Sequence, residues 1–176
     1  MIRRLIGAAL VASAWSCEAD MADPRDQWSV VVTTDAPIPQ LGDRILVDLL
    51  DEKGALACDT CRRQFGVTPD SDEAGAELPT FPLSFGVVPT DGAISAVRVR
   101  LYRAERVGAD GLPAGPIIDA SGRLPEASGI TEVGIELRTD CFGVGGDATS
   151  GSTCDPASGT LAPMPLLGAP RRPGLV

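Results

Sequence analysis

Five cysteines are the residues whose type and spacing point most directly to chemistry. A thiol can pair in a disulfide, ligate zinc, take part in redox exchange or carry a lipid. The cysteines are Cys17, Cys58, Cys61, Cys141 and Cys154. Their number is odd, so one is left over when the others pair. If Cys17 carries a lipid, the remaining four form two disulfides.

Four cysteines allow three connectivities. We favour local pairing, Cys58 with Cys61 and Cys141 with Cys154, because each pair brackets turn-forming residues. The stretch between Cys141 and Cys154 contains four glycines. Closing a loop of this size stabilises a fold by about 3 kcal/mol in the chain-entropy model.

Two other interpretations of the cysteines remain open. A thioredoxin-like redox pair at Cys58 and Cys61 needs a helix N-terminus, and no βαβ pattern surrounds it, although the neighbouring Arg62 and Arg63 favour a thiolate. A zinc site normally uses two close pairs, whereas twelve residues separate Cys141 from Cys154. A structural disulfide in an oxidising compartment is the interpretation that requires the fewest additional features of the chain.

The N-terminus has the pattern of a signal peptide. Arg3 and Arg4 precede an apolar stretch, residues 5–15, which ends before Glu18 and Asp20. A transmembrane helix needs about 20 apolar residues, so this stretch is too short to be one. We therefore predict that residues 1–16 direct export.

Two cleavage sites compete. An Ala-x-Ala motif ends at Ala14, as in ordinary secreted proteins. Cleavage after Ser16 instead leaves Cys17 at the N-terminus, which resembles the lipobox of bacterial lipoproteins. Ser16 fits that motif, whereas Ala14 stands where Leu is usual and Trp15 where a small residue is typical. The odd cysteine favours the lipoprotein.

The expected location follows from that choice. Residues 17–27 form a lipidated Cys17 and a polar, acidic tether, so the membrane is a partner through the lipid anchor. We predict an exported protein of the cell envelope, an outer-membrane lipoprotein facing the periplasm or the cell surface. An envelope protein or a polysaccharide is the expected further partner.

Charge and composition exclude several classes of function. The net charge is −9, and loss of residues 1–16 removes two arginines and no acid, which makes it −11. Such a chain is repelled by phosphate backbones, so we expect no nucleic acid. The absence of histidine removes the usual general base and the commonest metal ligand. We predict no catalytic residue and no cofactor.

Carboxylates near turns are the candidate cation ligands. None follows the spaced calcium loop D-x-[DN]-x-[DN]-G, and turn chemistry accounts for them without a metal. The glycine cluster 143–146 lacks the strand-to-helix context of a nucleotide site. The carboxylates in question are Asp110, Asp119, Asp140, Asp147 and Asp155.

A row of arginines interrupts the acidic composition. Val97, Val99 and Leu101 alternate with polar positions, which predicts a strand with one buried face. The other face carries Arg98, Arg100 and Tyr102, followed by Arg103 and Arg106. We expect this face to be solvated. The alternative is a docking stripe, Arg98, Arg100 and Arg103, for an acidic partner or polysaccharide.

About seven short strands with turns between them predict an all-β fold. The clearest runs begin at Trp28, Ile45, Leu56, Pro82, Val97 and Val133, and a last strand lies within 160–167. A single antiparallel β-sandwich over residues 28–167, similar to immunoglobulin or fibronectin type III domains, buries one face of each strand. A small β-barrel is the alternative. Residues 69–79 are predicted to be an exposed loop and residues 168–176 a disordered Pro- and Arg-rich tail.

Several short stretches carry a resemblance to a known group of proteins: residues 34–37, 42–44, 58–63, 82–86, 97–103, 141–143 and 153–155. On these stretches, most of the mature chain resembles an uncharacterised N-terminal region of myxobacterial-type envelope lipoproteins. In larger relatives that region precedes a domain similar to formylglycine-generating enzymes, which we do not expect here, so no functional residue is carried over.

We therefore expect a non-catalytic binding or spacer module. One alternative is a surface module that binds carbohydrate or calcium. The other is an enzyme that uses carboxylates or a redox pair formed by Cys58 and Cys61. An enzyme needs a pocket with convergent polar groups, which a spacer does not.

Overall fold

The computed structural model of the protein describes residues 25–67, 80–89 and 93–170. Cys17, the predicted signal peptide, most of the tether, the loop 69–79 and residues 171–176 lie outside these ranges. Within them the chain forms nine strands and a short 3-10 turn, η1 (Thr139–Cys141). The strands are β1 (Gln27–Thr34), β2 (Arg44–Leu50), β3 (Arg62–Gly66), β4 (Leu83–Val87), β5 (Ala96–Tyr102), β6 (Ile118–Arg123), β7 (Ile130–Leu137), β8 (Ser152–Asp155) and β9 (Thr160–Pro163).

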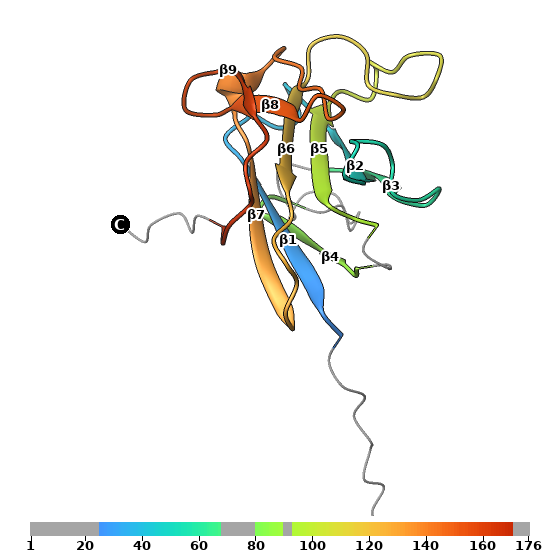
Figure 1. The fold of residues 1–176 in the computed structure, drawn as a ribbon. Coiled ribbons are helices and arrows are strands. Elements are labelled where there is room, and N and C mark those ends of the chain that lie inside the picture. Colours follow the sequence, from blue (N-terminus) through green and yellow to red (C-terminus); the bar gives the residue numbers. More distant parts are fainter. Residues whose placement is uncertain (1–24, 68–79, 90–92, 171–176) are drawn as a thin grey trace, which may run out of the picture.

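The strands form two sheets that pack against each other, with a small ribbon at one end (Figure 1). One sheet has the order β4-β1-β7, and the other has the order β3-β2-β5-β6. The β8–β9 ribbon lies at the end opposite to the start of β1. The all-β prediction is confirmed, and the sheets do not close into a barrel.

The core lies between the two sheets. Alternating residues of both sheets meet there, as the period of a strand requires. Val97, Val99 and Leu101 of β5 are completely buried, as predicted. They pack in one cluster with Val30 and Val32 of the opposite sheet.

The strand pairing differs from a purely antiparallel sandwich at one place. β1 and β7 pair in parallel, from Gln27 opposite Ile130 to Thr34 opposite Leu137. Both strands start at the same end of the sandwich, where the Gln27 amide donates to the carbonyl of Gly129 at 2.8 Å. A parallel pair needs a long connection, and five strands intervene between β1 and β7.

Two strand boundaries also differ from the prediction. The third strand starts at Arg62 rather than near Leu56, because the Cys58–Cys61 disulfide closes a tight turn just before it. β8 has no alternating apolar residues, so the sequence did not predict it; its Cys154 is held by the disulfide to Cys141.

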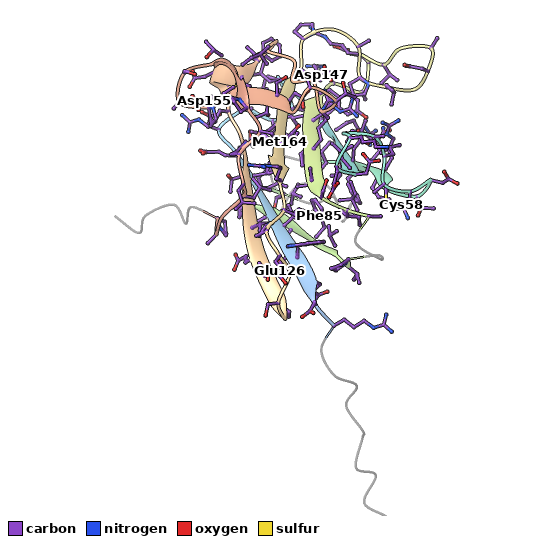
Figure 2. The ribbon with its side chains drawn as sticks, viewed as in Figure 1. Cys58, Phe85, Glu126, Asp147, Asp155 and Met164 are labelled. Atoms are coloured by element: carbon purple, nitrogen blue, oxygen red, sulfur yellow. A yellow bond between two sulfur atoms is a disulfide. The ribbon has the colours of Figure 1, made fainter. Side chains whose placement is uncertain are left out.

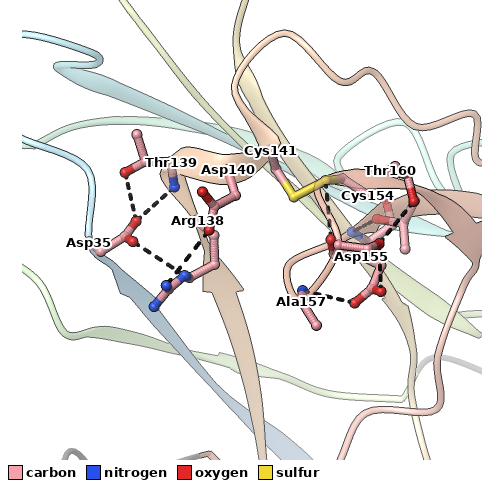
Figure 3. The surroundings of a disulfide bond; sticks show 12 residues. Asp35, Arg138, Thr139, Asp140, Cys141, Cys154, Asp155, Ala157 and Thr160 are labelled. Carbon is pink, nitrogen blue, oxygen red and sulfur yellow. Dashed lines mark hydrogen bonds and ion pairs between the residues drawn. A yellow bond between two sulfur atoms is a disulfide. The ribbon is translucent and has the colours of Figure 1, made fainter.

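Both expected disulfides are present. The Cα atoms of Cys58 and Cys61 are 5.0 Å apart, and those of Cys141 and Cys154 are 5.8 Å apart. Figure 3 shows the second bridge joining the end of η1 to β8. No described segment forms a helix long and apolar enough to span a bilayer.

The prediction that Arg98, Arg100 and Tyr102 face solvent is wrong. Tyr102 is completely buried and Arg100 is 7% exposed. The chain that follows η1 lies over this outer face: Arg98 donates to the carbonyl of Gly146 at 3.1 Å, and Ala148 packs in a small apolar cluster with Leu50 of β2. Strands β2, β5 and β6 of this sheet are therefore largely buried on both faces, whereas the edge strand β3 is mostly exposed.

Residues 164–170, which we call the C-terminal strap, close the edge of the sandwich. The Leu167 amide donates to Arg123 of β6 at 2.8 Å, and the Gly134 amide of β7 donates to Gly168 at 2.9 Å. The strap thus ties the two sheets together. The prediction of a disordered tail from residue 168 is wrong for residues 168–170, which lie against β7.

Candidate functional site

Two residues of the predicted docking stripe, Arg98 and Arg100, belong to a mostly buried ion cluster. The cluster consists of Asp48, Arg62, Arg98, Arg100 and Asp119. Arg62 Nε donates to Asp48 at 2.7 Å, and Arg100 pairs with the other oxygen of the same carboxylate. Arg98 Nε donates to Asp119 at 2.9 Å. The two acids are 2% and 1% exposed, so both carboxylates are buried, while the Arg62 side chain reaches solvent.

The ion pairs of the cluster are diagonal across the sheet. The register places Arg98 opposite Asp48 and Arg100 opposite Asp119. Each arginine nevertheless pairs with the acid that lies opposite the other arginine. Such diagonal neighbours are within reach of long side chains. Each arginine therefore links β5 to a neighbouring strand by more than the backbone ladder.

Burial and neighbouring charges shift the pKa of these arginines in opposite directions. Burial lowers the pKa of Arg98, but the hydrogen bond and charge of Asp119 outweigh it, and the pKa is raised. Burial and the charge of Arg98 lower the pKa of Arg100. Arginine is effectively always protonated in proteins, so both groups carry a charge. The cluster holds strands together and does not present cations to a partner, so the docking-stripe prediction is wrong for Arg98 and Arg100.

Arg103, the third residue of the predicted stripe, is held at the surface. Its Nε lies 3.1 Å from Glu105, and its guanidinium donates to the carbonyl of Gln40 at 3.2 Å. The three arginines therefore do not form one accessible stripe.

The aspartates considered for calcium are occupied in turns and ion pairs. Asp110 accepts from the Leu112 amide at 3.0 Å. Hydrogen bonds from Thr149 lower the pKa of Asp147, and the Ala157 amide does the same for Asp155. Among the described residues, no three carboxylates or thiols converge on one point.

An open groove of about 1360 Å³ lies in the described part of the chain. Its base runs across the ends of three strands of one sheet. The Ser95 amide donates to Leu50 at the end of β2, and the Leu124 amide after β6 donates to Ser95, both at 2.8 Å. The strap and the start of β1 complete its walls with Met164, Leu166 and Trp28.

The floor of the groove is apolar and mostly aliphatic. Trp28 and Ile94 are buried there, and Met164 is 8% exposed. The indole Nε1 of Trp28 donates to the carbonyl of Pro125 at 2.8 Å, which fixes the ring against the wall. Leu166, at the rim, is 61% exposed. Concave apolar surfaces with a few polar groups are the usual form of ligand sites.

Charged side chains surround this floor. Four are acids, and two are arginines. Glu126 and Met164, which are labelled in Figure 2, both line the groove. The charged lining residues are Asp26, Asp51, Glu52, Glu126, Arg25 and Arg123.

A second hollow, about 630 Å³, lies between the strap and the edge strands β6 and β7. Its walls include Ser121, whose hydroxyl is buried with no hydrogen-bond partner among the described residues. Salt bridges from Arg138 to Asp35 and Glu136, at 3.2 Å each, stand at its mouth. It is smaller than the groove and is covered by the strap.

No sequence pattern predicted the groove, because seven separated segments build it. Each contributes two to five residues, and none has a pattern of its own. The ion cluster did have a signal: Asp48 and Asp119 are single acids inside apolar runs, ILVDLL and PIIDA. A lone acid in such a run predicts a buried basic partner.

No protein-family model matches the chain, and no curated protein or solved structure is significantly similar to it.

Proposed function

We propose that the protein is an exported, lipid-anchored binding module of the bacterial cell envelope, and that the groove is its ligand site. The observation that carries the binding proposal is the groove itself, with its volume of about 1360 Å³ and its apolar floor. Ligand pockets typically measure about 300–1,000 Å³, so an open groove of this size suits an extended ligand.

The position of the groove agrees with a membrane anchor. Arg25 lines the groove at the end where the tether joins β1. Eight residue steps separate Cys17 from Arg25, and an extended chain of that length spans at most about 28 Å. A lipid on Cys17 therefore keeps the groove close to the bilayer surface.

The other candidate functions have less support. Sugar sites commonly use exposed aromatic rings, but Trp28 and Tyr102 are buried and the partly exposed Phe65 lies outside the groove. Redox exchange needs a helix N-terminus or a similar device beside the Cys58–Cys61 pair, and the described chain has a turn there.

The anchor is tested by labelling. Expressed in a bacterial host, the protein should incorporate labelled palmitate and partition into detergent, and Cys17→Ala should abolish both. A soluble wild-type protein that begins at Trp15 would contradict the anchor.

The groove is tested with an uncharged solvatochromic dye, Nile red. Trp28 lines the groove, so bound dye should accept energy from its indole. Leu166→Glu places a charge at the rim and should weaken dye binding. Leu161→Glu is the matched control, because Leu161 is 56% exposed on β9 and does not line the groove. Equal binding by both variants would refute the assignment of the site.

A further inference from the structure

We infer that the groove binds an extended peptide segment that carries both basic and aliphatic side chains. This inference rests on the proposed function, in which the groove is the ligand site. Three features support this inference: the charges at the rim of the groove, its apolar floor, and the distance that the strands set between two acidic residues of the rim.

Two of the four acids at the rim are available to a ligand. Asp26 and Asp51 already accept backbone amides: Asp26 accepts from Gly129 at 2.6 Å, and Asp51 accepts from Lys53 and Ala55 at 2.9 Å each. Glu52 and Glu126 are exposed, and neither has an ion pair among the described residues. These two carboxylates are the groups that a ligand cation would meet.

The backbone places the two carboxylates on either side of the groove's base. Glu52 follows the end of β2 and Glu126 follows β6, and Ser95 lies between them, hydrogen-bonded to Leu50 on one side and to Leu124 on the other. Two strand spacings separate these segments by about 10 Å. An extended peptide advances about 3.3 Å per residue, so basic side chains four residues apart, which lie on the same side of the chain, span this gap.

The charge balance favours a cationic occupant. The groove is lined by four acids and two arginines, Arg25 and Arg123, and the whole chain carries a net charge of −9. A field of this sign attracts cations and repels anionic lipids. The two arginines remain available for the carbonyl groups of a peptide backbone, which a fatty acid lacks along its length.

The floor supplies the second requirement. Trp28, Ile94 and Met164 present apolar surface between the acidic walls. Aliphatic side chains that alternate with basic ones would lie on this floor while the basic groups reach the rim, because side chains alternate between the two sides of an extended chain. The ligand class is therefore a basic, aliphatic peptide segment.

The experiment is a titration followed by tryptophan fluorescence. The chain has two tryptophans, and removal of residues 1–16 takes away Trp15 and leaves Trp28, in the groove, as the remaining one. The mature anchored protein, purified in detergent, is titrated with an end-blocked eight-residue peptide of alternating Lys and Leu, with the same peptide carrying Glu for Lys, and with palmitate. The Lys peptide should change Trp28 emission and saturate, with the Glu peptide at least tenfold weaker and palmitate without effect.

A pair of variants tests the carboxylates. Glu52→Gln with Glu126→Gln should weaken the Lys peptide about fivefold, the sum expected of two exposed ion pairs. Glu105→Gln with Glu132→Gln removes two exposed acids outside the groove and should leave binding unchanged. Preference for the Glu peptide or palmitate would overturn the ligand class while the groove remains the binding site. Failure of all three ligands and of Nile red would overturn the proposed function as well.

Discussion

Removal of Asp48 is the perturbation whose effect can be worked out most fully from the structure. Its carboxylate is 2% exposed and pairs with both Arg62 and Arg100. Asp48→Ala leaves the guanidinium of Arg100, whose side chain is 9% exposed, without its acid. A sequence-based expectation of a solvated arginine predicts almost no effect.

Breaking a buried ion pair by removing one partner costs about 3–5 kcal/mol, because the other charge stays buried. Arg62, with 36% of its side chain exposed, adds only about 0–1 kcal/mol, since solvent screens it. We expect Asp48→Ala to lower the free energy of unfolding by about 3–4 kcal/mol, out of about 5–15 kcal/mol for a domain. The corresponding fall in Tm is roughly 10 °C.

Urea unfolding followed by Trp28 fluorescence measures this loss. Asp110→Ala is the control, because that carboxylate lies in an exposed turn, and it should change stability by less than about 0.5 kcal/mol. Asp48→Leu with Arg100→Met replaces both charges by apolar groups and should recover most of the stability. If Asp48→Ala unfolds at the same urea concentration as Asp110→Ala, the buried ion cluster is wrong.

Three further predictions follow from the disulfide, the strap and the acid hydrogen bonds. Replacing Cys141 and Cys154 together by Ala should lower the free energy of unfolding, measured by thermal unfolding, by about 3 kcal/mol. Peptide mapping of the wild type without reduction should recover this pair and the Cys58–Cys61 pair. Other pairings would contradict the fold around η1. Gly134→Val should displace the strap, because a Cβ there would lie 2.6 Å from Cα of Pro170. Hydrogen exchange at Leu167 should then speed up, while exchange at Val99 stays slow. If Leu167 exchanges at the same rate in the variant and the wild type, the strap does not have the closing role. Burial raises the pKa of Asp35, but hydrogen bonds from Thr139 and the charge of Arg138 outweigh it and hold the pKa below 3.8. The contribution of Asp35 to stability is therefore present above about pH 4 and is lost as the pH falls through the lowered pKa. The Tm difference between wild type and Asp35→Asn should shrink at acid pH. A Tm difference that grows at acid pH would contradict the lowered pKa.

The fold was predictable where apolar and polar residues alternate along a strand. Val97, Val99 and Leu101 were expected in the core and are fully buried. The same pattern led to a wrong prediction for the opposite face of β5. Alternation shows which face of a strand is apolar, but it does not show which segment of the chain covers the polar face. In this protein Asp48 neutralises Arg100 beneath a loop, and the two residues are fifty-two positions apart in the sequence. Such long-range pairing has no local signature except the lone acid in an apolar strand.

The candidate site was not predictable, for a different reason. Trp28, Leu124 and Met164 line the groove, yet each comes from a separate part of the chain and has an ordinary role in its own segment. The packing of the two sheets and the strap brings them together. The charge of the whole chain was the one property of the site that the composition anticipated.

Hydrogen exchange in the native envelope tests the central claim, that the groove holds a ligand there, most directly. Exchange is measured by mass spectrometry on the protein in membrane vesicles of its own cells and on the detergent-purified protein. We predict slower exchange in the vesicles for residues 50–54, 94–96 and 123–127, which line the groove, and no change for the exposed loop 103–116. Identical exchange of the groove segments in both preparations would contradict the claim.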